Sequence, residues 1–156
     1  MNELIETSLF EVSKLFLTPV LILIALLFVY ALWSVGRFAV EAAMRAKGSP
    51  LKRYALAHPE LGSDDLELWI LKELEPLRIA SRTAPMLGLV ATMIPMGPAL
   101  LSLSNGEMAG VGENLAVAFS AVIIALLAAS ITFWILSIRR RWLLQDLRSV
   151  ERERAA

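Results

Sequence analysis

Thr92 and Ser120 carry hydroxyl groups inside long apolar segments, where a hydroxyl can orient water or the acidic group of a neighbouring protein. Glu113 lies at the edge of the segment that contains Ser120. Asp, Glu, Lys, Arg and His are missing from these segments, although such residues usually mark proton relays and ion pathways in membranes. A proton relay would therefore need an ionisable group from a partner. The apolar segments cover residues 15–36, 83–106 and 114–138.

Small residues accompany both hydroxyls at helical spacing. Gly88, Thr92 and Met96 fall roughly on one helix face, which suits a pore or a protein contact. The last segment carries an alanine stripe, and small residues let helices approach closely within a membrane. The stripe includes Ala118, Ala121 and Ala125. Two simpler interpretations remain open: the hydroxyls bond carbonyls of their own helix, and the alanines serve only packing.

The elements that position these residues are predicted to be membrane-spanning helices. About 20 helical residues cross a hydrocarbon core of roughly 30 Å, and each apolar segment reaches that length. The composition agrees, because 57% of the 156 residues are hydrophobic and the mean hydropathy is +0.64. We predict an all-α integral membrane protein in which residues 1–156 form one domain with three transmembrane helices.

Positive charges lie almost entirely on one side of the predicted spans. Loop 37–82 and tail 139–156 hold fourteen of the fifteen Lys and Arg residues, and the other side holds only Lys14. The positive-inside rule therefore predicts a cytoplasmic loop and tail, with the N-terminus outside and the C-terminus inside. We expect a multi-pass protein of the inner (plasma) membrane. Arg139 to Arg141 would anchor this topology, with anionic membrane lipids as a second interpretation.

Short signals indicate where the helices begin and end. Gly48-Ser49-Pro50 should end an extension of the first span into the cytoplasm. The acids from Asp64 to Glu67 favour the start of a helix that leads into the second span. Pro76 and Pro85 lie along that helix, and either could kink it. The third helix should also extend into the cytoplasm, to about Leu147.

Several kinds of chemistry are excluded or unsupported. The chain has no cysteine and a single histidine, so it cannot form a His/Cys zinc site by itself. We expect no metal, no cofactor, no nucleic-acid partner and no enzymatic activity. An auxiliary subunit of a transporter would need binding groups near the middle of the membrane, and the sequence shows none.

The sequence from Thr83 to Thr92, Thr-Ala-Pro-Met-Leu-Gly-Leu-Val-Ala-Thr, resembles the MotA/TolQ/ExbB proton channel family. In that family a cytoplasmic helix runs into a segment of the Ala-Pro-Leu-Leu-Gly-Leu-Leu-Gly-Thr type. The resemblance continues from Gly110 to Phe119, which is similar to the family's entry to its last span. The predicted topology agrees, and the chain resembles a short ExbB/TolQ-like member.

The resemblance implies a homo-oligomer, a ring of five subunits, whose second and third spans line a pore. Two single-span partners of the ExbD/TolR/MotB type would pass through this pore, each with a membrane aspartate. Proton flow would drive rotation of one part against the other. The chain would then be the ion-channel (stator) subunit of a motor driven by the proton-motive force.

The resemblance also transfers roles to particular residues. Thr92 matches the family's pore threonine in span two, and Glu113 matches its glutamate at the outer entry to span three. The family threonine in span three falls on Ala118 or, in another alignment, on Val122, and neither residue has a hydroxyl. Ser120 lies nearby. The less polar pore favours an alternative function, a non-conducting membrane scaffold that holds a partner protein.

Overall fold

The computed structural model describes residues 2–45, 48–106 and 108–155, and it describes side chains from residue 11 onward except that of residue 13. The described residues form helices and short connections, and they contain no strand. The helices are α1 (Asn2–Met44), α2 (Pro50–Ala57), α3 (Ser63–Ser104) and α4 (Met108–Ala155). The predicted all-α architecture is therefore confirmed.

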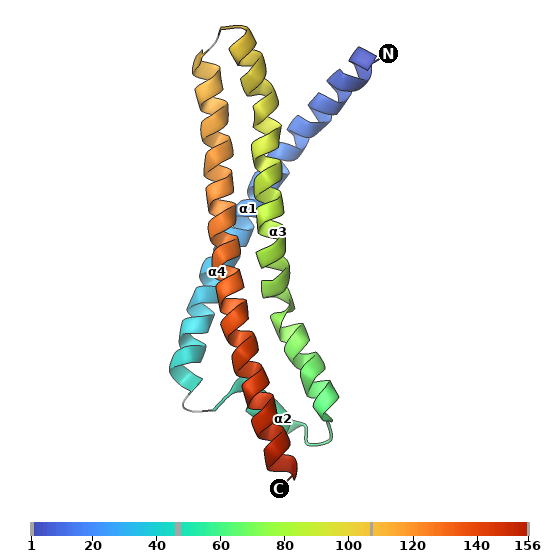
Figure 1. Ribbon diagram of the computed structural model, residues 1–156, viewed down its shortest axis with the longest axis vertical. Helices are drawn as coiled ribbons and strands as arrows, with labels where there is room; N and C mark the ends of the chain where they lie inside the picture. Colours follow the sequence, from blue (N-terminus) through green and yellow to red (C-terminus); the bar gives the residue numbers. More distant parts are fainter. Residues whose placement is uncertain (1, 46–47, 107, 156) are drawn as a thin grey trace.

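Helices α3 and α4 form a long antiparallel hairpin, and α1 crosses beside it (Figure 1). Gly106 has a φ of 77° in the turn between α3 and α4, a conformation that favours glycine. The first part of α1 leans away from the hairpin on one side, and its last part lies on the other side, where it contacts α4. Helix α2 lies at the opposite end from the turn. We call these two ends the hairpin end and the α2 end.

Three of the helices are long and apolar enough to cross a membrane: α1, α3 and α4. This agrees with the three predicted spans. The boundaries of those spans, at about 15–36, 83–106 and 114–138, remain predictions because each helix continues beyond its apolar part. The continuations of α1 past residue 36, of α3 before residue 83 and of α4 past residue 138 form the α2 end of the molecule.

The helix boundaries follow the signals in the sequence. Ser49 begins α2, because its side-chain oxygen accepts a hydrogen bond from the Lys52 amide at 3.1 Å. At the start of α3, the Asp65 carboxylate accepts a hydrogen bond from the Gly62 amide at 3.1 Å. Pro76 and Pro85 do not interrupt α3, which is continuous from Ser63 to Ser104.

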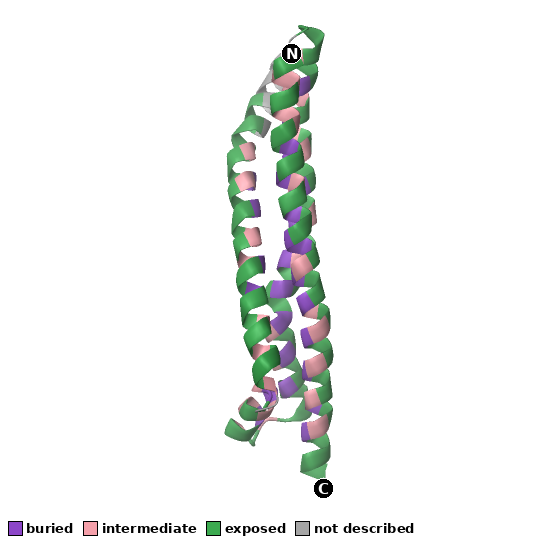
Figure 2. Cartoon of the chain, turned by 90° about the vertical axis from the view of Figure 1, so that its left-hand side faces the viewer, coloured by how far each residue is buried: buried purple, intermediate pink, exposed green. Residues whose placement is uncertain are grey.

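The buried core changes in composition along the bundle. At the α2 end it is rich in leucine and isoleucine, contributed by α2, α3 and α4. Toward the hairpin end, two clusters are built mainly from alanine where α1, α3 and α4 meet. Figure 2 shows buried positions on the faces that the helices turn toward one another. This change matches a passage from water, where burying large apolar groups is favourable, to lipid, where close packing holds helices together.

Candidate ion pathway and charged cluster

Thr92 lies on α3 and is half-buried. Its hydroxyl donates a hydrogen bond to the Leu89 carbonyl at 2.7 Å. A hydroxyl that donates in this way keeps lone pairs that can accept a hydrogen bond from water or from a protonated acid. Thr92 can therefore offer an acceptor at its surface while its own proton stays bound to the helix.

Ser120 lies on α4 and is exposed, and its hydroxyl donates to the Ala116 carbonyl at 2.8 Å. It lines a shallow groove of about 380 Å³ between α4 and α1, together with Leu21, Ile24 and Ala25. Ser120 thus faces α1. No hydrogen bond joins it to Thr92 in the described part of the chain, so the structure does not bring the two hydroxyls together as one site.

Gly88 is buried between α3 and α4. A Cβ atom at this position would lie 3.0 Å from the Ala125 Cβ and 3.3 Å from the Val122 Cγ2. Gly88 therefore lets the two helices approach closely, and Val122 packs directly opposite it. The surface next to this contact includes Thr92, one helical turn further along α3.

The alanine stripe is buried within the chain. Ala121 and Ala125 belong to one cluster with Val20 and Ile24 of α1 and Ala91 of α3. Ala118 is also buried on α4. Of the two roles that the sequence left open for the stripe, the structure shows packing between helices of one chain.

Met96 and Glu113 lie at the surface. The Met96 side chain is exposed on α3 and remains available for a contact with another protein or with lipid. Glu113 is exposed on α4 close to the hairpin end. Within the ranges that the structure describes, no ion pair or hydrogen bond involves its carboxylate.

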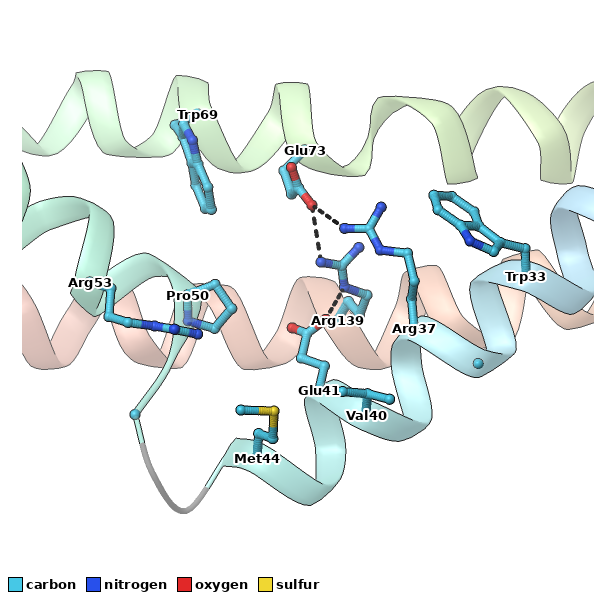
Figure 3. A pocket seen from close by; sticks show the side chains of 12 residues that line it. Trp33, Arg37, Val40, Glu41, Met44, Pro50, Arg53, Trp69, Glu73 and Arg139 are labelled. Carbon is cyan, nitrogen blue, oxygen red and sulfur yellow. Dashed lines mark hydrogen bonds and ion pairs between the residues drawn. The ribbon is translucent and has the colours of Figure 1, made fainter.

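Four charged side chains from three helices meet near the α2 end, as Figure 3 shows. Arg139 of α4 is buried and lies between two acids: its Nε is 2.9 Å from Glu41 Oε2, and its guanidinium donates to Glu73 Oε1 at 3.2 Å. Arg37 lies 3.7 Å from the same Glu73 oxygen. The Arg139 Nε–H lacks a hydrogen-bond partner, so its contact with Glu41 is an ion pair without hydrogen-bond alignment.

This charged cluster balances two positive and two negative charges and joins α1, α3 and α4. It borders a pocket of about 550 Å³ that also contacts Trp33, Trp69 and Arg53. The prediction that Arg139 serves with its neighbours as a topology anchor missed this role. Arg139 is the first charge after the last apolar segment, and Arg37 and Glu41 are the first two charges after the first one. These positions, each just past the same end of a predicted span, were the signal in the sequence that could have predicted the cluster.

A second contact ties the end of α1 to α4. Phe38 stacks on Trp142 with ring centroids 5.3 Å apart, and the Arg45 guanidinium lies 4.4 Å from the Trp142 ring centroid. Arg45 also pairs with Asp146 at 3.4 Å. Together with the charged cluster, these contacts hold α1, α3 and α4 together at the α2 end.

Groups of His, Cys, Asp and Glu suited to a metal ion do not occur in the described ranges.

The model of the MotA/TolQ/ExbB proton channel family matches residues 56–151. This match covers more than half of the chain. The chain belongs to the MotA/TolQ/ExbB proton channel family. No curated protein and no solved structure matches it. As a family member with three long apolar helices, it is a multi-pass membrane protein.

The family match coincides with the most tightly built part of the molecule. It begins at the end of α2 and includes all of α3 and most of α4, which form the hairpin. Helix α1 lies outside the matched region. Thr92, Gly88, Ser120 and Glu113 all lie inside it.

Proposed function

We propose that this chain is the channel-forming (stator) subunit of a motor that the proton-motive force drives. Several copies would form a ring, with five expected, around single-span helices of the ExbD/TolR/MotB type. The ring would lie in the inner membrane, with the N-terminus outside and the C-terminus in the cytoplasm. The distribution of Lys and Arg supports that orientation.

One observation carries the proposal beyond family membership. The apolar parts of α1, α3 and α4 contain no Asp, Glu, Lys, Arg or His. A protein that moves protons across the hydrocarbon region needs a group that binds and releases them there. The partner helix would supply this acid, while the ring would supply the polar surface along which the acid moves.

We assign that polar surface to α3 near Thr92 and to the adjacent part of α4. Thr92 has free acceptor capacity, and Gly88 brings α4 close enough for both helices to line one surface. Ser120 faces α1, which would place it away from the pore if α1 is the outer helix. Glu113, at the hairpin end, would stand at the outer entrance.

Native mass spectrometry of the protein, extracted gently from its own membranes, tests the proposal. Five copies together with two copies of a small single-span protein that carries a membrane aspartate would support it. Membrane vesicles containing that complex should then take up protons when a gradient is imposed. A monomer, or a fixed complex with a multi-span transporter, would contradict the proposal.

A non-conducting scaffold is the second candidate function. Val122, which has no hydroxyl, stands at one of the two positions where the family threonine of span three falls, and the hydroxyls of Thr92 and Ser120 both donate to their own helices. Proton flux separates the two candidates, because a scaffold would support partner binding without any flux.

Val122→Thr tests how far the missing hydroxyl limits conduction. Threonine is close to valine in shape and fits beside Gly88, so we expect the ring to assemble and proton flux through the complex to rise. Val117→Thr is the matched control, because Val117 lines the groove between α4 and α1. Equal flux for both variants and the parent would show that polarity at Val122 does not limit transport.

A further inference from the structure

Before the predicted span, between residues 63 and 82, helix α3 has two different faces. One face packs on α4, and the opposite face is exposed. The buried face includes Leu66, Ile70 and Leu74. The opposite face follows helical spacing in steps of three or four residues, and it mixes exposed apolar side chains with two acids. Its members are Asp64, Leu68, Leu71, Glu75 and Ile79. Leu68 is 65% exposed and Ile79 is 54% exposed, which is costly if water surrounds them.

Helix α4 carries a matching face at the same end of the bundle. Its buried face includes Arg139, Leu143 and Leu147. The opposite face is basic and has an apolar centre, formed by Arg141, Leu144, Arg148 and Arg152. Three of these residues line a shallow groove of about 380 Å³ whose lining contains no acid. In the parts of the chain that the structure describes, no ion pair or hydrogen bond involves the side chains of Arg141, Arg148, Asp64 or Glu75.

The charges on the two faces lie at similar heights along the bundle. In the hairpin, Glu73 lies level with Arg139, and Ser63 bonds Glu151. Counting from these pairs puts Asp64 within about two residues, or roughly 3 Å, of the height of Arg148.

The apolar centres match as well. Counting from the same pairs puts Leu68 within about two residues, or roughly 3 Å, of the height of Leu144. Glu75 lies about four residues, or roughly 6 Å, from the height of Arg141, a difference that a long arginine side chain can bridge. The leucines and the Asp64 and Arg148 charges of the two faces therefore lie at similar heights, and the arginine side chain spans the larger offset between Glu75 and Arg141.

We propose that these faces are the two halves of one contact between copies of this chain: the basic face of α4 docks on the acidic and apolar face of α3 in the next copy. This inference rests on the proposed ring. A ring uses heterologous contacts, in which each copy presents two different faces. Rotation about an axis along the bundle keeps every residue at its own height, so only faces matched in height can meet.

A second copy explains the observations better than lipid does. Arg148 lies ten residues past the end of the predicted span, which is about 15 Å along the helix and beyond a headgroup at the membrane surface. Anionic lipid would also leave Leu68 and Leu71 exposed. A neighbouring copy covers these leucines and supplies opposite charge to both faces.

Paired cysteines test the contact directly, because the chain has none of its own. Leu68 and Leu144 lie on opposite sides of the hairpin in one chain, so a disulfide between them must join two copies. Leu68→Cys combined with Leu144→Cys should give a ladder of covalent multimers after mild oxidation in membranes. Leu68→Cys combined with Ser137→Cys is the matched control. Ser137 is on the same side of α4 but about 10 Å higher, so this pair should not give the ladder.

Charge exchange gives an independent measurement in the paired-cysteine protein. Arg141→Glu and Glu75→Arg should each reduce the ladder and the ring population, and the double variant should restore both. Glu67→Arg is the control: it changes an exposed acid on the same helix, roughly 80° around the axis from Glu75, and should leave the ladder intact. Unchanged circular dichroism would show that each variant is folded.

The outcomes separate this inference from the proposed function. Rings in native mass spectrometry without the disulfide ladder would overturn the inference and leave the proposed function standing. Monomers would overturn both. If Arg141→Glu is not rescued by Glu75→Arg, and vesicles of neutral lipid reproduce its defect in the parent, the basic face binds anionic lipid and the inference is wrong.

Discussion

The hydroxyl of Thr92 donates inward to Leu89 and keeps its acceptor sites at the surface of α3. A protonated acid on a partner helix can donate to such a site, and a deprotonated acid cannot. Thr92 would therefore distinguish the two protonation states of a passing carboxyl group. This role needs only one side chain and does not require Ser120.

Thr92→Val removes the acceptor and preserves the shape of the side chain. A neutral hydrogen bond contributes about 1 kcal/mol, so losing it at a rate-limiting step should slow proton-coupled work roughly fivefold. Proton uptake by vesicles containing the complex with its partner measures this effect. Thr92→Ser keeps the hydroxyl and should retain most of the flux, while native mass spectrometry should find intact rings for both variants. Equal flux for valine and threonine would make Thr92 a packing residue.

Gly88 allows a close approach that any larger residue would disturb. Gly88→Ala would place a methyl group 3.0 Å from the Ala125 Cβ, so the helices must separate slightly. Overpacking of this kind costs about 1–3 kcal/mol. We expect a lower melting temperature in detergent for Gly88→Ala and partial recovery when Ala125→Gly is added. If Ala128→Gly restored the melting temperature of Gly88→Ala to the same extent, the effect would not come from the contact between Gly88 and Ala125.

At the scale of helices, the charged cluster holds α1 against the hairpin. Glu41→Gln would remove one acid from the buried Arg139, and breaking a buried ion pair costs about 3–5 kcal/mol. Arg139 is 10% exposed and Glu41 is 17% exposed, but Arg139 keeps its ion pair with Glu73, so we expect a loss below that range. Thermal unfolding in detergent should show the loss. Glu60→Gln, an exposed acid in the turn before α3, should change stability very little.

The helices themselves could be predicted from sequence, but their neighbours could not. The lengths of the apolar segments, the break at Gly48-Ser49-Pro50 and the acids from Asp64 to Glu67 depend on local chemistry. They therefore indicated the helices, the end of α1 and the start of α3 correctly. Helical spacing also grouped Ala118, Ala121 and Ala125 on one face. The spacing could not predict which helix covers that face, because it depends only on the residues of one helix and not on the helices that pack against it. For the same reason, the position of Ser120 beside α1 and the burial of Arg139 were missed.

At the scale of the whole molecule, the bundle should have one orientation in the membrane. A cysteine in place of Ser104, near the hairpin end, should react with a membrane-impermeant maleimide in intact cells or spheroplasts. A cysteine in place of Ser149, near the C-terminus, should react only after the membrane is opened. The reverse pattern would contradict the positive-inside assignment and invert the proposed entrance at Glu113.

The change from a leucine-rich core at the α2 end to alanine clusters nearer the hairpin end has a further consequence, for temperature. Hydrophobic stabilisation weakens on cooling, whereas close packing between helices in lipid does not depend on water in the same way. The two halves of one continuous bundle therefore respond differently to cold. In a chilled membrane we expect the α2 end to loosen first, while the two alanine clusters continue to hold the three helices together.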